Sequence, residues 1–184
     1  MIVFYYFIFR MTLEERIANA IRTGILDVSD MGLTSLPDLP DGIQKLFCTH
    51  NRLQRLPKLP ATLKELNCMH NELTELPEFP ETLEYLECSF NKLTGIQNLP
   101  NSMSYLVVSN NPLQSIANLP ERLMILTSEN TLLSGLPEFP DSLIQLNCRN
   151  NPWNNEFLSC IKDEEMLKGF RNKYIVSTYR LKGL

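Results

Sequence analysis

The sequence predicts an α/β solenoid, a repeat protein with a parallel β-sheet along its concave side, an extended, polyproline-like convex side and a helical cap at each end. Three observations predict this fold class. A 20-residue period runs through most of the 184-residue chain with almost no insertions. Leucine and cysteine alternate with other residues at the start of each unit, which is the two-residue period of a strand. Paired prolines then forbid a long helix on the return path.

The period is visible as columns of one residue type that recur every 20 residues. The asparagine and cysteine columns contain Asn51, Asn71, Asn91, Asn111, Asn151, Cys48, Cys68, Cys88 and Cys148. Leucine columns include those of Leu46 and Leu53, and proline columns those of Pro37 and Pro40. Chance does not align so many columns, so the array is the main structural unit of the chain.

The chain begins with an apolar run, residues 1–10, that Arg10 closes. This run is too short to span a bilayer as a helix, which needs about 20 residues. It also lacks the basic start and cleavage site of a signal peptide. We expect an extension upstream of the folded unit; an edge strand and a short membrane-touching segment are the alternatives.

Residues 11–24 predict an N-terminal capping helix. Thr12 and Glu15 have the spacing of a capping box. Gly24 is placed to end the helix as its C-cap. The expected apolar face consists of Leu13, Ile17 and Ile21. A solenoid needs such a cap because its first coil would otherwise expose the core.

Residues 25–153 make up the repeat array, with about seven units. In the unit from Leu63 to Thr82 we expect a strand from Glu65 to Met69, with Leu66 and Cys68 pointing into the core. Strands of successive units would pair in parallel, about 4.8 Å apart. The units depend on their neighbours, since one unit alone cannot bury its leucines.

The repeating unit reads L-x-x-L-x-C-x-x-N-x-L-x-x-L-P-x-L/F-P. This pattern resembles the leucine-rich repeat family in its short, 20-residue form, which is similar to the repeats of secreted bacterial effectors and of giant DNA viruses of amoebae. The resemblance is specific for the fold and only weakly specific for function. It implies that the asparagine column is structural, each side chain bonding turn backbone of its own coil and of the next.

Two columns break in the sixth unit. Thr131 stands where other units have asparagine, and Ser128 stands where they have cysteine. Met31 replaces asparagine in the first unit, which is next to the cap. We therefore predict that the turn at Asn130 and Thr131 is the least protected part of the array.

Residues 154–184 predict a C-terminal cap that is helical, with one or two helices. The residues at helical spacing are Leu167, Phe170, Tyr174, Thr178 and Leu181. Residues 174–179 are rich enough in β-branched side chains to form a strand instead.

Composition excludes several classes of partner and compartment. A net charge of −4 and a pI near 5.3 argue against a nucleic-acid-binding chain. Five cysteines, an odd number without paired spacing, favour a reducing intracellular compartment such as the cytoplasm, a host cell or a virion. No stretch is long and apolar enough for a stable membrane span. We expect a monomer or a dimer formed through the chain ends.

A search for catalytic motifs predicts that the chain is not an enzyme and needs no cofactor. It has no P-loop, no G-x-G-x-x-G and no G-x-S-x-G. The two histidines give few candidates for a triad, and Cys160 lacks an obvious base nearby in the sequence.

Cys48-x-His50 and Cys68-x-His70 have the composition of a tetrahedral zinc site. We disfavour zinc because the cysteines fall at inward strand positions and the histidines at turn positions. A disulfide between Cys48 and Cys68 is conceivable, since adjacent strands bring their Cα atoms within reach. We expect no metal and unpaired thiols.

The outward strand positions are where a function can be placed, because the fold does not specify them. An exposed aromatic and aliphatic cluster beside acidic residues has the anatomy of a protein-binding patch. The candidate residues are Phe47, Met69, Tyr85, Glu87, Phe90, Tyr105, Val107 and Ile125. We expect a concave face that binds another protein, in a pathogen or virus setting if the resemblance extends to biology. The alternative is a structural or virion component that self-associates through its ends.

Overall fold

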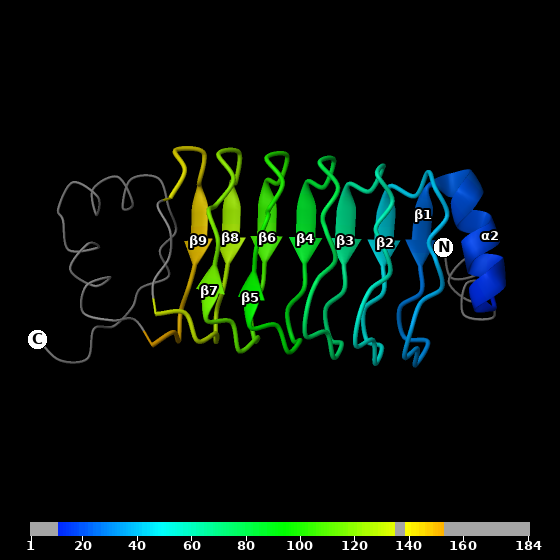
Figure 1. The fold of residues 1–184 in the computed structure, drawn as a ribbon, viewed down its shortest axis with the longest axis horizontal. Helices are drawn as coiled ribbons and strands as arrows, with labels where there is room; N and C mark the ends of the chain where they lie inside the picture. Colours follow the sequence, from blue (N-terminus) through cyan, green and yellow to red (C-terminus); the bar gives the residue numbers. More distant parts are fainter. Residues whose placement is uncertain (1–10, 135–138, 153–184) are drawn as a thin grey trace, which may run out of the picture.

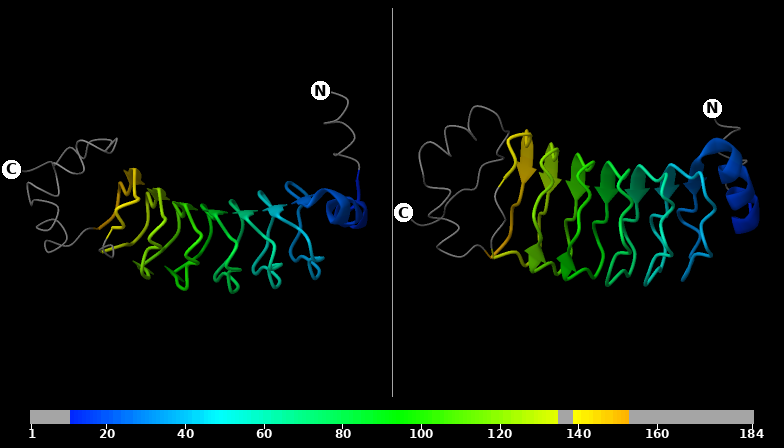
Figure 2. Two further views of the ribbon diagram at one scale, coloured as in Figure 1. Left: turned by 90° about the horizontal axis from the view of Figure 1, so that it is seen from above. Right: turned by 45° about the horizontal axis from the view of Figure 1, so that its top comes forward.

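The computed structural model describes residues 11–134 and 139–152, which form one helix and a regular parallel solenoid (Figure 1). The expected fold class is confirmed. The main sheet has seven parallel strands in the order β1-β2-β3-β4-β6-β8-β9. These strands are β1 (Ile25–Asp27), β2 (Lys45–Phe47), β3 (Glu65–Asn67), β4 (Tyr85–Glu87), β6 (Tyr105–Val107), β8 (Ile125–Thr127) and β9 (Gln145–Asn147). The array curves gently, with this sheet on the concave side and the return segments on the convex side (Figure 2).

Helix α2 (Leu13–Thr23) covers the first coil and has the predicted ends. The backbone N–H of Thr12 donates to Glu15 Oε2 at 2.8 Å, and the N–H of Glu15 donates to Thr12 Oγ1 at 3.3 Å. Gly24 ends the helix in the left-handed conformation, with φ 72°, which glycine adopts without a steric penalty.

The apolar face of α2 differs from the predicted one at its last member. Ile21 is 63% exposed, whereas Ala20 is fully buried. At 100° per residue, Ala20 lies about 20° from Leu13 around the helix axis, and Ile21 lies about 80° away. The face that packs on the array therefore runs through Leu13, Ile17 and Ala20.

Side chains on α2 and in its C-terminal turn also occupy the free edge of β1. Arg16 Nη1 donates to the carbonyl of Asp27 at 2.8 Å. The hydroxyl of Thr23 donates to the Ile25 carbonyl at 3.2 Å, and the Ile25 N–H donates to the same hydroxyl oxygen at 3.3 Å. Edge strands that keep unpaired backbone groups invite pairing with other chains, and here most of those groups are already bonded.

The inward columns form a continuous core. Leu26 is the register partner of Leu46, and Leu46 is that of Leu66; all three side chains are fully buried. Cys48, Cys68 and Cys88 follow them as a second buried column that Val108 and Ser128 continue. Each coil therefore packs against its neighbours alone, as expected for a solenoid.

The convex side is mostly extended, irregular backbone, but it contains a small second sheet that was not predicted. Strands β5 (Gly95–Ile96) and β7 (Ser115–Ile116) pair in parallel there. In these two coils Gln97 and Ala117 replace the proline of the other units. Ala117 therefore keeps a backbone N–H, which donates to Ile96 O at 3.0 Å; proline at this position has no such donor.

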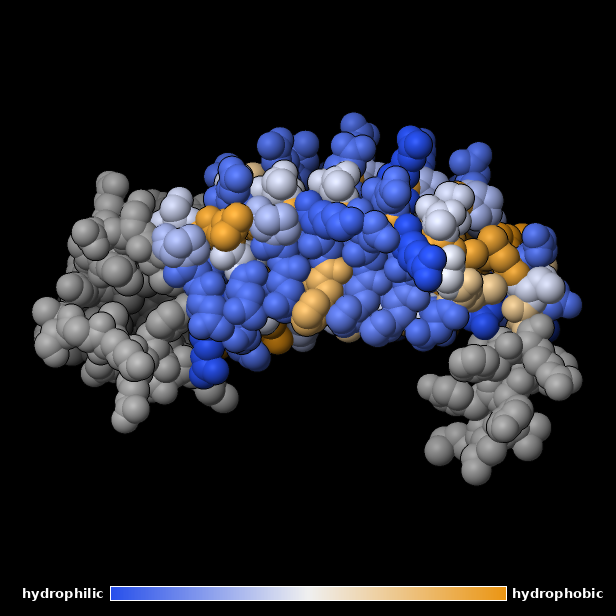
Figure 3. Space-filling view, turned by 90° about the horizontal axis from the view of Figure 1, so that it is seen from below, coloured by the Kyte–Doolittle hydropathy of each residue, from blue (hydrophilic) through white to orange (hydrophobic). Residues whose placement is uncertain are grey.

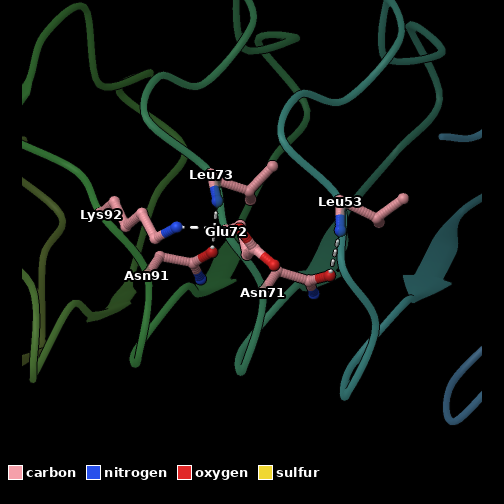
Figure 4. Close-up of polar contacts among 6 residues, drawn as sticks. All are labelled: Leu53, Asn71, Glu72, Leu73, Asn91 and Lys92. Carbon is pink, nitrogen blue, oxygen red and sulfur yellow. Dashed lines mark hydrogen bonds and ion pairs between the residues drawn. The ribbon is translucent and has the colours of Figure 1, made fainter. Parts of the chain in front are cut away.

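The asparagine column bonds its own coil and the preceding one, rather than the next. Asn71 Oδ1 accepts from the Leu53 N–H at 3.0 Å (Figure 4). Asn71 Nδ2 donates to the carbonyls of Cys48 and Cys68 at 2.9 and 3.1 Å. Asn91 repeats this pattern one coil later. Buried turn backbone that a short strand leaves unpaired is satisfied in this way.

A column of hydroxyls, which the sequence analysis missed, joins the coils on the other side of the strands. Each hydroxyl donates to a backbone carbonyl 19 residues earlier, at 2.7–2.8 Å. Its members are Thr62, Thr82, Ser102 and Ser142. Arg122 interrupts this column, close to the coil in which the other two columns break.

The sixth coil is bonded differently from its neighbours. The Thr131 hydroxyl donates to Asn151 Oδ1, the atom that in other coils accepts a backbone N–H. Ser128 Oγ is buried and has no hydrogen-bond partner among the described residues. The C-terminal cap and the choice of helix or strand for residues 174–179 lie outside the described residues, as does the segment 1–10.

Candidate protein-binding face

The outward residues of successive strands lie side by side across the concave face. Tyr85 is the register partner of Tyr105, and Tyr105 is the partner of Ile125. Glu87 is likewise paired with Val107. These five residues, which we call the concave cluster, occupy the three consecutive strands β4, β6 and β8 of the curved sheet.

Two aromatic rings form the centre of the concave cluster. The ring centroids of Tyr85 and Tyr105 are 5.9 Å apart and the ring planes are tilted by 38°, an arrangement that aromatic pairs favour over a face-to-face sandwich. Both residues are half-buried. Burial first, and then the carboxylates of Glu87 and Glu65, raise the pKa of the Tyr85 phenol. The phenol is therefore neutral at physiological pH and close to two negative charges.

Phe47 and Met69 lie at the N-terminal side of the cluster. Phe47 ends β2 and has Asn67 as its register partner in β3. Met69 follows the end of β3 by two residues and is partly buried. They belong to the same outward surface of the sheet but are not register neighbours of the tyrosines.

Phe90, the remaining candidate for this face, lies after the end of its strand rather than on it. It lies in the turn after β4 with φ 57° and is 45% exposed. Its ring stacks on His70 at 4.2 Å between centroids, and His70 stacks on His50 at 4.4 Å. The three rings form a ladder along the edge of the sheet where the strands end.

In the later coils, asparagine side chains occupy the turn position equivalent to Phe90, and their amides form a second ladder. Asn130 Nδ2 donates to Asn110 Oδ1 at 3.1 Å, and Asn150 Nδ2 donates to Asn130 Oδ1 at 2.9 Å. All members of this column have φ between 53° and 58°, a left-handed conformation that asparagine tolerates better than most residues. Figure 3 shows the side of the molecule on which the strands end. Over the middle coils this surface is mostly hydrophilic, and its apolar residues lie in separate spots.

The structure does not bring the zinc candidates together. Cys48 and Cys68 are buried in the core, whereas His50 and His70 stack in the outer turns. Burial raises the pKa of the Cys48 thiol to about 12 and raises the pKa of the Cys68 thiol well above its usual value, which disfavours the thiolate that metals bind. Within the described ranges no group of three or more His, Cys, Asp or Glu side chains is placed to hold a metal ion.

A shallow depression at the start of β4, β6 and β8 is lined by residues that include Glu84, Arg122 and three serines. The serines are Ser102, Ser104 and Ser142, and each donates its hydroxyl to a backbone carbonyl of the preceding coil. These bonds give the serines a structural role, whereas a nucleophile would need its hydroxyl bonded to an activating base. Cys160 lies outside the described residues.

In the part of the chain that the structure describes, no helix has the length and apolar character needed to cross a membrane. No protein-family model and no curated protein sequence matches this chain.

Solved structures do resemble the chain. The leucine-rich repeat domain of a Shigella effector is 28% identical, with a TM-score of 0.68, over 82% of this chain and 80% of that one. YopM, a leucine-rich effector protein from Yersinia pestis, is 28% identical with a TM-score of 0.63 over 76% of this chain, and YopM from Yersinia enterocolitica is 25% identical with a TM-score of 0.55. The chain spans less than half the length of either YopM structure, 47% and 41% respectively.

Proposed function

Because this chain has the fold of the leucine-rich repeat proteins, we propose that it is a non-enzymatic module that binds another protein on its concave strand face. The observation that carries the proposal is the Tyr85–Tyr105 pair, which lies in register at the middle of that face with Val107 and Ile125 beside it. Tyrosine is enriched among the residues that dominate binding energy at protein interfaces.

The contrast between the inward and the outward positions of each strand supports the concave face, rather than another surface, as the binding site. The inward position holds Leu in all seven strands of the main sheet, because the core requires it. The outward position changes from Lys45 to Glu65, Tyr85 and Ile125, although the backbone geometry is the same. Residues that the fold leaves free are available for recognition.

A protein partner suits the charge and shape of this face better than a nucleic acid. The chain carries a net charge of −4, and Glu65 and Glu87 lie beside the tyrosines. Phosphate backbones are bound by clustered Lys and Arg, and the concave cluster contains neither. The rigid coils also present the face without an ordering cost at binding.

We further propose that the partner is a protein of a host cell and that the chain acts in the host cytoplasm. The support is that the similar structures include effectors of Shigella and Yersinia. Buried thiols in Cys48, Cys68 and Cys88 are compatible with a reducing compartment.

The alternative function is that of a structural protein that self-associates, here through the free edge of β1. The hydrogen bonds at that edge disfavour this alternative. Arg16 and Thr23 already bond the carbonyls of Asp27 and Ile25, so a second chain pairing there would have to displace them. Analytical ultracentrifugation of the full chain separates the readings. A stable dimer at micromolar concentration would favour the structural role.

The test of binding is a pull-down from host-cell lysate with wild type and with Tyr85→Arg/Tyr105→Arg. A matched control, Thr74→Arg/Gln114→Arg, adds the same charge at exposed positions outside the concave face. We expect a partner that wild type and the control capture and the tyrosine variant loses, with unchanged circular dichroism for all three. A partner retained by the tyrosine variant would move the site to the convex side or the ends.

A further inference from the structure

The concave cluster is acidic as well as aromatic. Glu65 is the register partner of Tyr85 across β3 and β4, and Glu87 lies on the same outward side of β4 two residues further on. Both carboxylates act on the Tyr85 phenol, as its raised pKa indicates. The ring that forms the middle of the face is thus flanked by negative charge on two sides.

The two carboxylates differ in what they are bonded to. Glu65 forms an ion pair with Lys45, at 2.6 Å between Nζ and Oε2. Glu87 Oε1 accepts the backbone N–H of Ser89 at 2.9 Å, which fixes the orientation of the carboxylate. Within residues 11–134 and 139–152, no Lys or Arg forms an ion pair with Glu87. A carboxylate has about four acceptor sites, so Glu87 keeps capacity for a donor from outside.

Resting on the proposed function, we infer that the partner segment held on this face carries an arginine whose guanidinium lies against the Tyr85 and Tyr105 rings and donates to Glu87. An arginine satisfies both groups at once, because its planar guanidinium stacks on aromatic faces and presents a fork of N–H donors to a carboxylate. A lysine would supply the charge but neither the stacking plane nor the bidentate geometry.

The same face also specifies a second feature of the partner segment. Val107 is the register partner of Glu87, and Ile125 is that of Tyr105; neither carries a charge. Ile125 lies one strand from Tyr105 and two strands from Tyr85, or about 5 and 10 Å at the usual strand spacing. The segment therefore places an apolar side chain about 5–10 Å from an arginine that lies against both rings.

The test selects binding peptides without assuming a partner. Phage-displayed random peptides are selected on the full chain and depleted on a Tyr85→Ala/Tyr105→Ala variant whose fold is verified by circular dichroism. Enrichment of arginine among the peptides that need the tyrosines supports the inference. Peptides that need the tyrosines but show no arginine enrichment overturn it and leave the proposed function intact. Peptides that bind equally well without the tyrosines, or a selection that enriches no peptide, would count against both the inferred arginine and the proposed function.

A second measurement tests the role of Glu87 with a selected peptide as the probe. Glu87→Gln should weaken its binding by about fivefold or more, since a close charge pair at an interface is lost. The control Glu78→Gln makes the same charge change at an exposed position of the proline-containing return segment, and it should change the affinity by less than about twofold. Equal effects of the two variants would show that Glu87 acts only through net charge and would overturn the proposed contact.

Discussion

Replacing Thr131 with asparagine should stabilise the array, because it would carry the asparagine column through the coil in which it is interrupted. In an intact coil, Asn91 donates to the carbonyls of Cys68 and Cys88, both at 3.0 Å, and accepts from the N–H of Leu73 at 2.9 Å. Among the residues that the structure describes, the Thr131 side chain instead makes one hydrogen bond, to Asn151 Oδ1. Threonine and asparagine have similar volumes, so the change neither opens a cavity nor overpacks the turn.

The expected gain follows from the number of hydrogen bonds. Three bonds replace one, and each net hydrogen bond contributes about 1 kcal/mol, so the free energy of unfolding should rise by about 2 kcal/mol. For a chain of this size, 1 kcal/mol shifts Tm by roughly 2–4 °C. The Thr131→Asn variant should therefore melt about 4–8 °C higher than wild type.

Urea unfolding monitored by far-ultraviolet circular dichroism measures the gain, and Asn91→Thr is the matched reverse change. That variant should lose about 2 kcal/mol by the same count of bonds. Hydrogen exchange should in addition be fastest near Asn130 in wild type and slower there in Thr131→Asn. If both variants unfold at the wild-type urea concentration, the side-chain amides do not hold the coils together and the reasoning fails.

Three further outcomes follow from the same structure. Ser128→Cys should raise the free energy of unfolding by about 1 kcal/mol or more, because it removes a buried hydroxyl that has no partner among the described residues; a loss of stability in urea would contradict this. Iodoacetamide at pH 8 should modify Cys148 slowly in the native chain, since burial raises the pKa of its thiol to about 11 and leaves roughly one thiol in a thousand ionised. The native thiol should become reactive as the pH rises toward that pKa, and mass spectrometry of peptides measures the modification. Rapid labelling at pH 8 would show that the pKa of this thiol is not raised. Arg16→Ala/Thr23→Ala should increase the mass measured by light scattering, because it uncovers backbone carbonyls at the edge of β1, and an unchanged monomer would show that these side chains do not protect the edge.

The inward half of the structure could be predicted from the sequence because the repeat itself determines register. Once Leu46 and Leu66 are recognised as equivalent, parallel pairing follows for each strand of the main sheet, and the leucines at this position are fully buried from Leu26 to Leu126. The same equivalence placed Tyr85 beside Tyr105 and Ile125. Periodicity thus predicts contacts between identical positions of neighbouring coils.

The features that were missed depend on backbone conformation, which a period does not encode. The period predicts that Phe90 is equivalent to His50 and His70, but it does not predict the left-handed backbone of this position or the stacking of the three rings. A signal was present: asparagine occupies the equivalent position at Asn110, Asn130 and Asn150, and asparagine is the residue that favours φ above zero.

The second sheet on the convex side was missed for a related reason. The paired prolines predict extended backbone in every unit, but Gln97 and Ala117 stand in place of a proline in two of them. A missing proline restores a donor, so exceptions to a column carry as much structural information as the column does.

The uniform register of the coils has a genetic consequence. Each strand pairs with its equivalent 20 residues away, so duplication or loss of one unit in the gene leaves every remaining pair in register. Array length and the order of outward side chains can then change by recombination between repeats, without redesign of the core. A lineage could in this way move the tyrosine-bearing coils along the array, or copy them, and change what the face recognises in a single event.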